Sequence, residues 1–331
     1  MSAAPGAAIL GCAGLALTAD EVTFFREADP FGFILFARNI EAPDQVRRLT
    51  AALREAVGRD APVLIDQEGG RVQRMRAPHW REWAPPLDTV QAAGSVAEAA
   101  RVMRLRSRVI AAELRAVGID ANCAPVADVA SDVTHPFLRN RCYGTDPAVV
   151  TQVARAVADG FLAGGVIPVV KHLPGHGRSH VDTHLDLPTV TASREALQAV
   201  DFAPFRALAD LPMAMTAHLV FSAYDGERPA TQSPVMIDVI RREIGFDGLL
   251  MTDDLNMEAL KGTLAERTAR SIAAGVDVAL QCNGHLDEME AVAGAAGRMG
   301  PEAWRRGQAA LAGRRDVVVD VPALMAELAN G

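Results

Sequence analysis

The stretch Val166-Ile167-Pro168-Val169-Val170-Lys171-His172 is a run of five apolar residues that ends in two ionisable side chains. A strand with one solvent-exposed face would alternate apolar and polar residues, whereas a continuous apolar run is typical of a parallel strand that is buried on both faces. In barrels of such strands, catalytic residues lie at the carboxyl ends. The stretch therefore predicts a buried parallel strand followed directly by functional side chains.

Apolar runs of the same kind recur along the 331-residue chain, separated by segments that read as helices or loops. Helical spacing of apolar residues follows Pro43 and stops at Gly58, and a second helix is expected from Val96 to Val117. The eight candidate strands are Ala8–Leu15, Phe31–Phe36, Pro62–Ile65, Ala121–Val129, Val166–Val170, Met213–Phe221, Leu249–Met251 and Val276–Leu280.

Eight strand and helix units over this length predict an α/β protein with a closed (β/α)₈ barrel of the TIM type, with irregularity expected in its first strands. We expect one catalytic barrel domain over residues 1–331, because no linker, repeat or low-complexity tract marks a boundary. The glycine-rich motifs of dinucleotide-binding and P-loop folds are missing from the sequence. An open doubly wound sheet is therefore disfavoured.

The composition limits the partners and the compartment. Half of the residues are hydrophobic, and 33 Lys and Arg against 41 Asp and Glu give a net charge of −8, which argues against nucleic acid as the ligand. The N-terminal stretch has no Lys or Arg and is too short for a membrane span, so we expect neither a secretory signal nor a membrane partner. Four scattered cysteines favour reduced thiols in the cytoplasm and no disulfide or cysteine-zinc framework: Cys12, Cys123, Cys142 and Cys282.

Polar side chains end six of the apolar runs. Each alone also fits a helix cap, but in a barrel these positions converge on one rim. They are Asp66 with Glu68, Asp128, Lys171 with His172, His218, Asp253 with Asp254, and Asn283.

The segment Ile65–Arg74, IDQEGGRVQR, places two carboxylates, two glycines and two arginines directly after a strand. Carboxylates at a strand end accept hydrogen bonds from hydroxyl groups, which suits a polyhydroxylated ligand. A structural turn with an internal Glu-Arg pair explains the segment equally well.

The segment Lys171–His184, KHLPGHGRSHVDTH, holds half of the eight histidines. Their spacing of four residues would suit a metal-binding helix face, but Pro174 and Gly175 favour a loop. Asp182 stands two residues before His184, where its carboxylate would orient the imidazole and raise its pKa, as an acid/base histidine requires. The alternative is a hydrogen-bonded loop with solvated histidines.

The segment Leu249–Met257, LLMTDDLNM, ends a strand in two adjacent aspartates. Because side chains alternate along a strand, we expect one of Asp253 and Asp254 to face the barrel mouth and the other to face the helices. Such a carboxylate could attack an anomeric carbon, ligate a metal, or cap a helix that starts near Met257.

Taken together, the Ile65–Arg74 segment, KHLPGHG with its Asp182-Thr183-His184 continuation, and Thr252-Asp253-Asp254-Leu255 resemble the bacterial β-N-acetylglucosaminidases of glycoside hydrolase family 3, in the short single-domain cytoplasmic form. The resemblance implies a retaining hydrolase without cofactor or metal that removes terminal β-linked N-acetylglucosamine. It assigns the nucleophile to Asp253 and the acid/base dyad to His184 and Asp182.

The resemblance also implies the binding residues and the substrate. It assigns sugar contacts to Asp66, Arg74, Lys171 and His172, and a further contact to Arg141, with Arg139 as a nearby competitor. The implied substrates are muropeptides of peptidoglycan recycling, in which N-acetylglucosamine is joined to anhydro-N-acetylmuramic acid or its peptides.

Four other functions compete with this interpretation. A family-3 β-glucosidase would generally lack the KHLPGHG and Asp-x-His features. A phosphorylase would use phosphate in place of water, a metal-dependent hydrolase would use the histidines and Asp253 as ligands, and a sugar-binding module would have no turnover.

Overall fold

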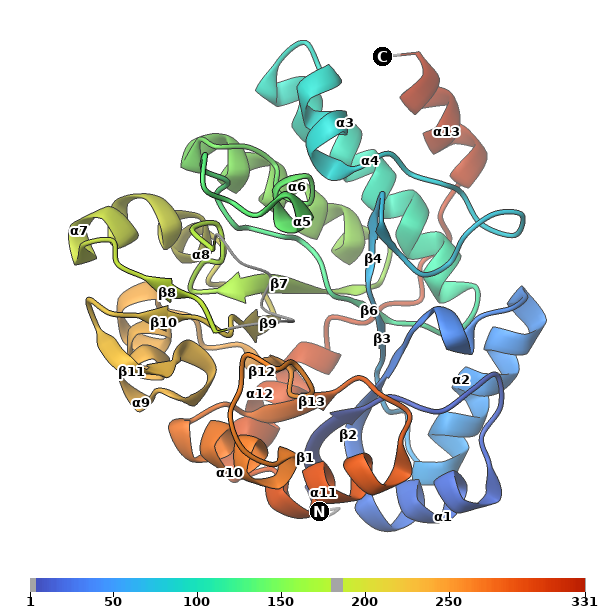
Figure 1. The fold of residues 1–331 in the computed structure, drawn as a ribbon. Helices are drawn as coiled ribbons and strands as arrows, with labels where there is room; N and C mark the ends of the chain where they lie inside the picture. The colour runs from blue at the N-terminus through green and yellow to red at the C-terminus, as the bar shows by residue number, and fades with distance from the viewer. Residues whose placement is uncertain (1–3, 180–186, 331) are drawn as a thin grey trace.

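Eight parallel strands close into a barrel in the computed structural model, which describes residues 4–179 and 187–330 (Figure 1). Each strand pairs with its sequence neighbours in the barrel, and the first strand closes on the last. The predicted (β/α)₈ barrel is therefore confirmed. The strands are β1 (Gly6–Leu10), β2 (Pro30–Leu35), β3 (Val63–Ile65), β6 (Ala121–Asn122), β7 (Ile167–Leu173), β9 (Met213–Thr216), β12 (Leu249–Asp254) and β13 (Val278–Gln281).

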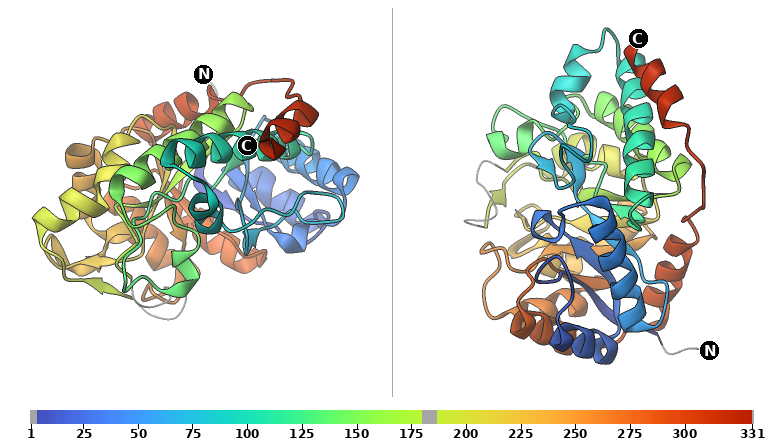
Figure 2. Two further views of the ribbon diagram at one scale, coloured as in Figure 1. Left: turned by 90° about the horizontal axis from the view of Figure 1, so that it is seen from above. Right: turned by 90° about the vertical axis from the view of Figure 1, so that its right-hand side faces the viewer.

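Helices surround the strands and cover their outer faces (Figures 1 and 2). Every residue of β2 and β7 is buried, which explains why β2 and the first four residues of β7 are continuously apolar. The longer helices are α1 (Ala19–Ala28), α2 (Pro43–Val57), α4 (Val96–Arg115), α6 (Pro147–Ala163), α10 (Leu264–Ala274), α11 (Leu286–Ala296), α12 (Pro301–Leu311) and α13 (Val321–Ala329). The shorter ones are α3 (Pro86–Ala92), α5 (Pro136–Arg139), α7 (Arg194–Ala196), α8 (Ala203–Ala207) and α9 (Pro234–Asp238).

The predicted end residues of α2 and the predicted start of α4 are confirmed. Pro43 is the first residue of α2, and Gly58 ends the helix in the left-handed conformation with φ of 62°. Helix α4 begins after Ser95, whose hydroxyl accepts a hydrogen bond from the backbone N–H of Glu98. It ends at Arg115, two residues before the expected position.

Several expected strands are shorter than their apolar runs. The run 213–221 is not one strand: β9 ends at Thr216, and β10 (Val220–Phe221) joins a small separate sheet with β8 (Thr189–Val190) and β11 (Asp225–Pro229). The run 121–129 forms a regular strand only over β6, and farther along Val126 makes an isolated bridge to Lys171.

The irregularity expected in the first strands is present in the pairing of β1 with β2, where the register shifts between Gly6 and Ile9. Strand β1 also ends at Leu10, earlier than the apolar run to Leu15. The next residue is Gly11, where a Cβ would lie 2.5 Å from the carbonyl oxygen of Cys282. The backbone segments that follow β1 and β13 therefore approach closely where these two strands meet.

Helices α4 and α6 cross closely at Gly160. A Cβ at this position would lie 2.5 Å from the carbonyl oxygen of Arg104 and 2.7 Å from Cβ of Ser107. The missing side chain is therefore what allows the two helix backbones to approach.

We expect Gly160→Ala to lower the free energy of unfolding by about 1–3 kcal/mol, because the added methyl overpacks the helix crossing. At Gly294 in α11, a Cβ would meet no neighbouring side chain or backbone atom within 4 Å. Gly294→Ala is therefore the control and should raise stability by about 0.5–1 kcal/mol. Urea denaturation of both variants makes the comparison, and equal gains in stability would contradict it.

Candidate active site

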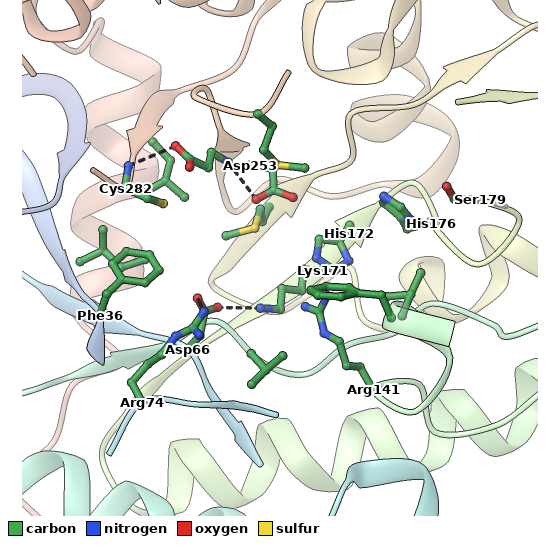
Figure 3. Close-up of a pocket in the computed structure, with 18 of the residues that line it drawn as sticks. Phe36, Asp66, Arg74, Arg141, Lys171, His172, His176, Ser179, Asp253 and Cys282 are labelled. Atoms are coloured by element: carbon green, nitrogen blue, oxygen red, sulfur yellow. Dashed lines mark hydrogen bonds and ion pairs between the residues drawn. The ribbon is translucent and has the colours of Figure 1, made fainter. Parts of the chain in front are cut away.

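A cavity of about 910 Å³, counting space open to solvent, lies at the carboxyl ends of the barrel strands (Figure 3). Its charged and polar lining comes from β7, β12 and the loops that follow the strands. It brings together residues that are far apart in the sequence, from Asp66 to Cys282. The ionisable side chains that line it are Asp66, Arg74, His135, Arg141, Lys171, His172, His176, Asp253, Asp254 and Cys282.

A chain of ion pairs joins five side chains at the wall of this cavity, four of which line it. The ammonium group of Lys171 lies 2.8 Å from Asp66 Oδ1 and 2.7 Å from Glu68 Oε1. Asp66 also accepts from Arg74 at 3.0 Å, and Glu68 accepts from Arg141 at 2.8 and 3.0 Å. We call these five residues the rim network. It links β3 and the following hairpin of β4 (Gln67–Gly69) and β5 (Val72–Gln73) to β7 and to the loop that carries Arg141.

The rim network keeps Asp66, Glu68 and Lys171 charged, although Glu68 and Lys171 are buried and Asp66 is partly buried. Burial alone would raise the pKa of Asp66, but Lys171 and Arg74 hold that pKa well below its ordinary value. Burial would likewise lower the pKa of Lys171, whereas the two carboxylates raise it. The site therefore offers an acceptor carboxylate and fixed cations to a polar ligand.

Asp128 holds the loop that follows β7. It is fully buried, and its Oδ2 lies 2.7 Å from Nδ1 of His172. Its Oδ1 accepts the backbone N–H groups of His172 at 3.3 Å and His176 at 2.7 Å. Burial opposes ionisation, but His172 and His176 lower the pKa of Asp128. This carboxylate therefore fixes the orientation of the His172 ring.

Asp253 lies at the end of β12 and lines the cavity (Figure 3). Its Oδ1 accepts the backbone N–H of Asp254 at 2.8 Å. Burial would raise its pKa, but the neighbouring rings of His172 and His218 lower it below the ordinary value. Asp253 is therefore an ionised carboxylate, the form that a nucleophile needs.

The expectation that the two aspartates face opposite sides is wrong, since Asp254 also lines the cavity. The register of β12 against β13 shifts between Met251 and Asp254, and such an irregularity breaks the alternation of side chains. The helix expected near Met257 is also absent there, and the next helix, α10, begins at Leu264. Asp254 instead accepts the backbone N–H groups of Asn256 at 3.2 Å and Cys282 at 3.1 Å.

The structure brings six predicted site residues to one cavity: Asp66, Arg74, Arg141, Lys171, His172 and Asp253. Between the two competing arginines, Arg141 lines the cavity, whereas Arg139 donates to the carbonyl oxygen of Ser131 at 2.6 Å. The predicted dyad of Asp182 and His184 lies outside the described residues. The internal Glu-Arg pair considered for a structural turn is not what the structure shows: Glu68 pairs with Arg141 and Lys171, which lie far away in the sequence, and Arg74 pairs with Asp66.

Sequence reasoning did not single out the aromatic part of the lining. Phe36 follows β2, and Phe137 and His135 belong to the segment after β6. The ring centroid of Phe36 lies 5.1 Å from the guanidinium carbon of Arg74. Because loop aromatics carry no spacing signal, nothing in the sequence distinguishes them from core residues.

No group of three or more His, Cys, Asp or Glu side chains suited to a metal ion occurs in residues 4–179 and 187–330. Over the same residues, no helix is long and apolar enough to cross a membrane.

A parallel barrel whose mouth holds an ionised aspartate beside a second carboxylate and several cations is an arrangement that glycoside hydrolases use. Residues 19–300 match the family model for the glycosyl hydrolase family 3 N-terminal domain. The chain belongs to glycosyl hydrolase family 3.

Curated relatives agree with this assignment. The chain is 37% identical over 292 residues to a β-hexosaminidase of Alkalilimnicola ehrlichii, covering 87% of this chain and 83% of the relative. It is 39% identical over 276 residues to a β-hexosaminidase of Methylococcus capsulatus, and this match covers 82% of this chain and 80% of the relative. Among solved structures, NagZ of Neisseria gonorrhoeae in complex with N-trifluoroacetyl-D-glucosamine superposes with a TM-score of 0.88 at 29% identity, over 99% of this chain and 98% of that one.

The rim network predicts the effect of removing the charge of Glu68, whose side chain is 2% exposed. We expect Glu68→Gln to lower the free energy of unfolding by about 3–5 kcal/mol, because Lys171 and Arg141 lose a buried counter-charge. Glu98→Gln, which removes the charge from a solvent-facing pair with Arg101, is the control and should leave the melting temperature unchanged. Thermal and urea unfolding measure the difference, and a Glu68 variant as stable as the wild type would refute the structural role of the network.

Asp254 predicts a pH-dependent stability. Burial raises its pKa from 3.8 to about 6, so the folded state disfavours the charged form. The stability contributed by the neutral carboxyl is complete below about pH 4 and is lost as the pH rises through about 6. Asp254→Asn should therefore stabilise the protein at about pH 8 relative to wild type and leave it unchanged at about pH 4. Denaturant titrations at both pH values test this, and a pH-independent difference would contradict it.

Proposed function

We propose that the chain is a retaining β-N-acetylglucosaminidase and that residues 1–331 form one catalytic barrel domain. The observation that carries the proposal is the buried, ionised Asp253 on the same cavity as the Asp66–Lys171 pair. The membership in glycosyl hydrolase family 3 and the β-hexosaminidase relatives support the amino-sugar specificity.

In the proposed first step, a carboxylate oxygen of Asp253 attacks the anomeric carbon. The glycosidic bond breaks, and His184 gives its proton to the leaving oxygen while Asp182 stabilises the imidazole. In the second step, His184 takes a proton from water, the water oxygen attacks the anomeric carbon, and the bond to Asp253 breaks. Net hydrolysis with retained configuration is the result.

A histidine acid/base suits the charges of this site. Asp253, Asp254 and Asp66 already line the cavity. A carboxylic acid beside the ionised nucleophile would add another negative charge after proton transfer, whereas a histidine becomes neutral.

The proposed sugar contacts follow from the rim network. Asp66 and the cations Lys171, Arg74 and Arg141 would hold hydroxyl groups, since ionised partners make the stronger hydrogen bonds. His172, whose Nδ1 is paired with Asp128, would present its other nitrogen to the sugar. These contacts would hold the ring while Asp253 reaches the anomeric carbon.

The proposed natural substrates are muropeptides, in which the N-acetylglucosamine is linked to anhydro-N-acetylmuramic acid or its peptides. The proposed setting is peptidoglycan recycling in the cytoplasm. A net charge of −8 and the polar sugar site are consistent with a carbohydrate rather than a nucleic-acid ligand.

A panel of chromogenic substrates tests the function directly. We expect release of nitrophenol from the β-N-acetylglucosaminide to be much faster than from the β-glucoside, together with cleavage of GlcNAc-anhydro-MurNAc. Adding phosphate should leave the rate and the free-sugar product unchanged. Faster glucoside cleavage, or phosphate-dependent formation of sugar 1-phosphate, would replace the proposal with one of the competing functions.

The proposed dyad predicts the phenotype of a His184 variant. His184→Gly should lower turnover by about 10²- to 10⁴-fold, because general acid/base catalysis is lost. The loss should be smaller for substrates with a good leaving group, which needs little protonation. His79→Gly, at an exposed position outside the cavity lining, is the control. Wild-type turnover in His184→Gly would remove His184 from the mechanism.

A further inference from the structure

The second histidine of KHLPGHG has no role in the proposed mechanism, although it lines the same cavity. His176 lies on the loop after β7, and its ring centroid is 5.4 Å from that of His172 (Figure 3). The side chain is buried, with the residue 7% exposed. It therefore forms part of the wall near Lys171 and His172.

The backbone around His176 is fixed on three sides. Its N–H donates to the buried carboxylate of Asp128 at 2.7 Å. A Cβ on Gly177 would lie 1.8 Å from the carbonyl oxygen of Val129, and Gly175 has φ of 142° with a Cβ position 3.1 Å from Cβ of Asp201. The two glycines therefore allow a close approach that holds the imidazole at one place in the cavity wall.

The imidazole of His176 has an unmet hydrogen-bonding capacity. Its Nδ1 is buried and has no hydrogen-bond partner among the described residues. Most buried polar side-chain atoms in proteins are paired, and an exception calls for an explanation. By contrast, Nδ1 of the neighbouring His172 is paired with Asp128. Packing alone would be served by an apolar side chain of the same size.

The ring is neutral at physiological pH. Burial and the adjacent His172 lower the pKa of His176 to about 4, and the opposing effect of Asp128 is smaller. A neutral imidazole carries one donor and one acceptor nitrogen. It therefore suits an uncharged partner, such as a hydroxyl or an amide group, whereas the rim network supplies the charged contacts.

We propose that His176 is a sugar-binding residue whose imidazole exchanges a hydrogen bond with one uncharged polar group of the bound amino sugar, either a hydroxyl or the acetamido group. Rotation of the ring by a half-turn would bring the buried Nδ1 to the side that faces the ligand, and the backbone would not have to move. This inference rests on the proposed function, because it takes N-acetylglucosamine as the occupant of the cavity.

A set of N-acetylglucosamine analogues, each lacking one polar group, tests the proposal. The competitive inhibition constant is measured for N-acetylglucosamine, its 3-, 4- and 6-deoxy analogues, and glucose, which lacks the acetamido group. The enzymes are wild type, His176→Leu, His176→Asn and the control His79→Leu. His176→Leu should raise the inhibition constant of N-acetylglucosamine by about 3- to 10-fold, the size expected for the loss of one neutral hydrogen bond. His176→Asn, which keeps a donor and an acceptor, should recover part of that loss.

The supporting pattern is selective. One analogue lacks the group that bonds to His176, and wild type and His176→Leu should bind this analogue with equal affinity. For every other analogue, His176→Leu should bind more weakly than wild type by the same factor as for N-acetylglucosamine. Equal loss for every analogue, or no loss at all, overturns the proposal, because a structural role would not depend on which group is missing. If neither variant at 176 folds, as judged by circular dichroism, His176 is a packing residue and the proposal also fails. If N-acetylglucosamine does not inhibit the wild type, the proposed function itself fails.

Discussion

The site depends on one ion-pair network whose centre, Lys171 with Glu68, is buried. Lys171 lies between Asp66 and Glu68, and each carboxylate is held by a further arginine, Arg74 or Arg141. Two carboxylates and three cations leave the network with one net positive charge. Burying any one of these groups alone would be costly, so they are stable only together. The fold satisfies this condition by bringing β3, β7 and the Arg141 loop to the same rim.

The carboxylates of the site differ in how their charges are balanced. Asp66 and Glu68 form ion pairs with their cations, whereas Asp253 is stabilised by a backbone N–H, by two histidines and, to a smaller extent, by the charge of Lys171. Since no lysine or arginine forms an ion pair with it in the part of the chain that the structure describes, its carboxylate oxygens are less shielded than those of Asp66. A nucleophile needs this combination of a negative charge and an accessible oxygen.

The barrel and much of the site could be predicted from the sequence, because both depend on local patterns. The run 166–172 contains the whole signal for β7 and its functional end, and β7 indeed spans Ile167–Leu173. The positions of Asp66, Lys171 and Asp253 follow from the rule that strand ends converge. Arg141 is indicated by the family resemblance alone, since its partner Glu68 is 73 positions away and no local pattern connects the two residues.

Other features depend on long-range contacts that a sequence pattern does not encode. The expected alternation of the two aspartates failed because the register shift in β12 follows from its pairing with β13. The run 213–221 splits because β10 pairs with β8, which is brought close by the fold. The aromatic lining at Phe36 and Phe137 likewise comes from segments whose positions follow from packing.

The central claim is that Asp253 is the group to which the sugar becomes bound. Peptide mass spectrometry of the enzyme treated with an activated fluorosugar tests this most directly, because a slow second step traps the glycosyl-enzyme. The account predicts one added sugar per chain, on the peptide that contains Asp253, and no adduct in Asp253→Asn. An adduct on Asp254 or Asp66, or none in an enzyme that the same reagent inactivates, would contradict it.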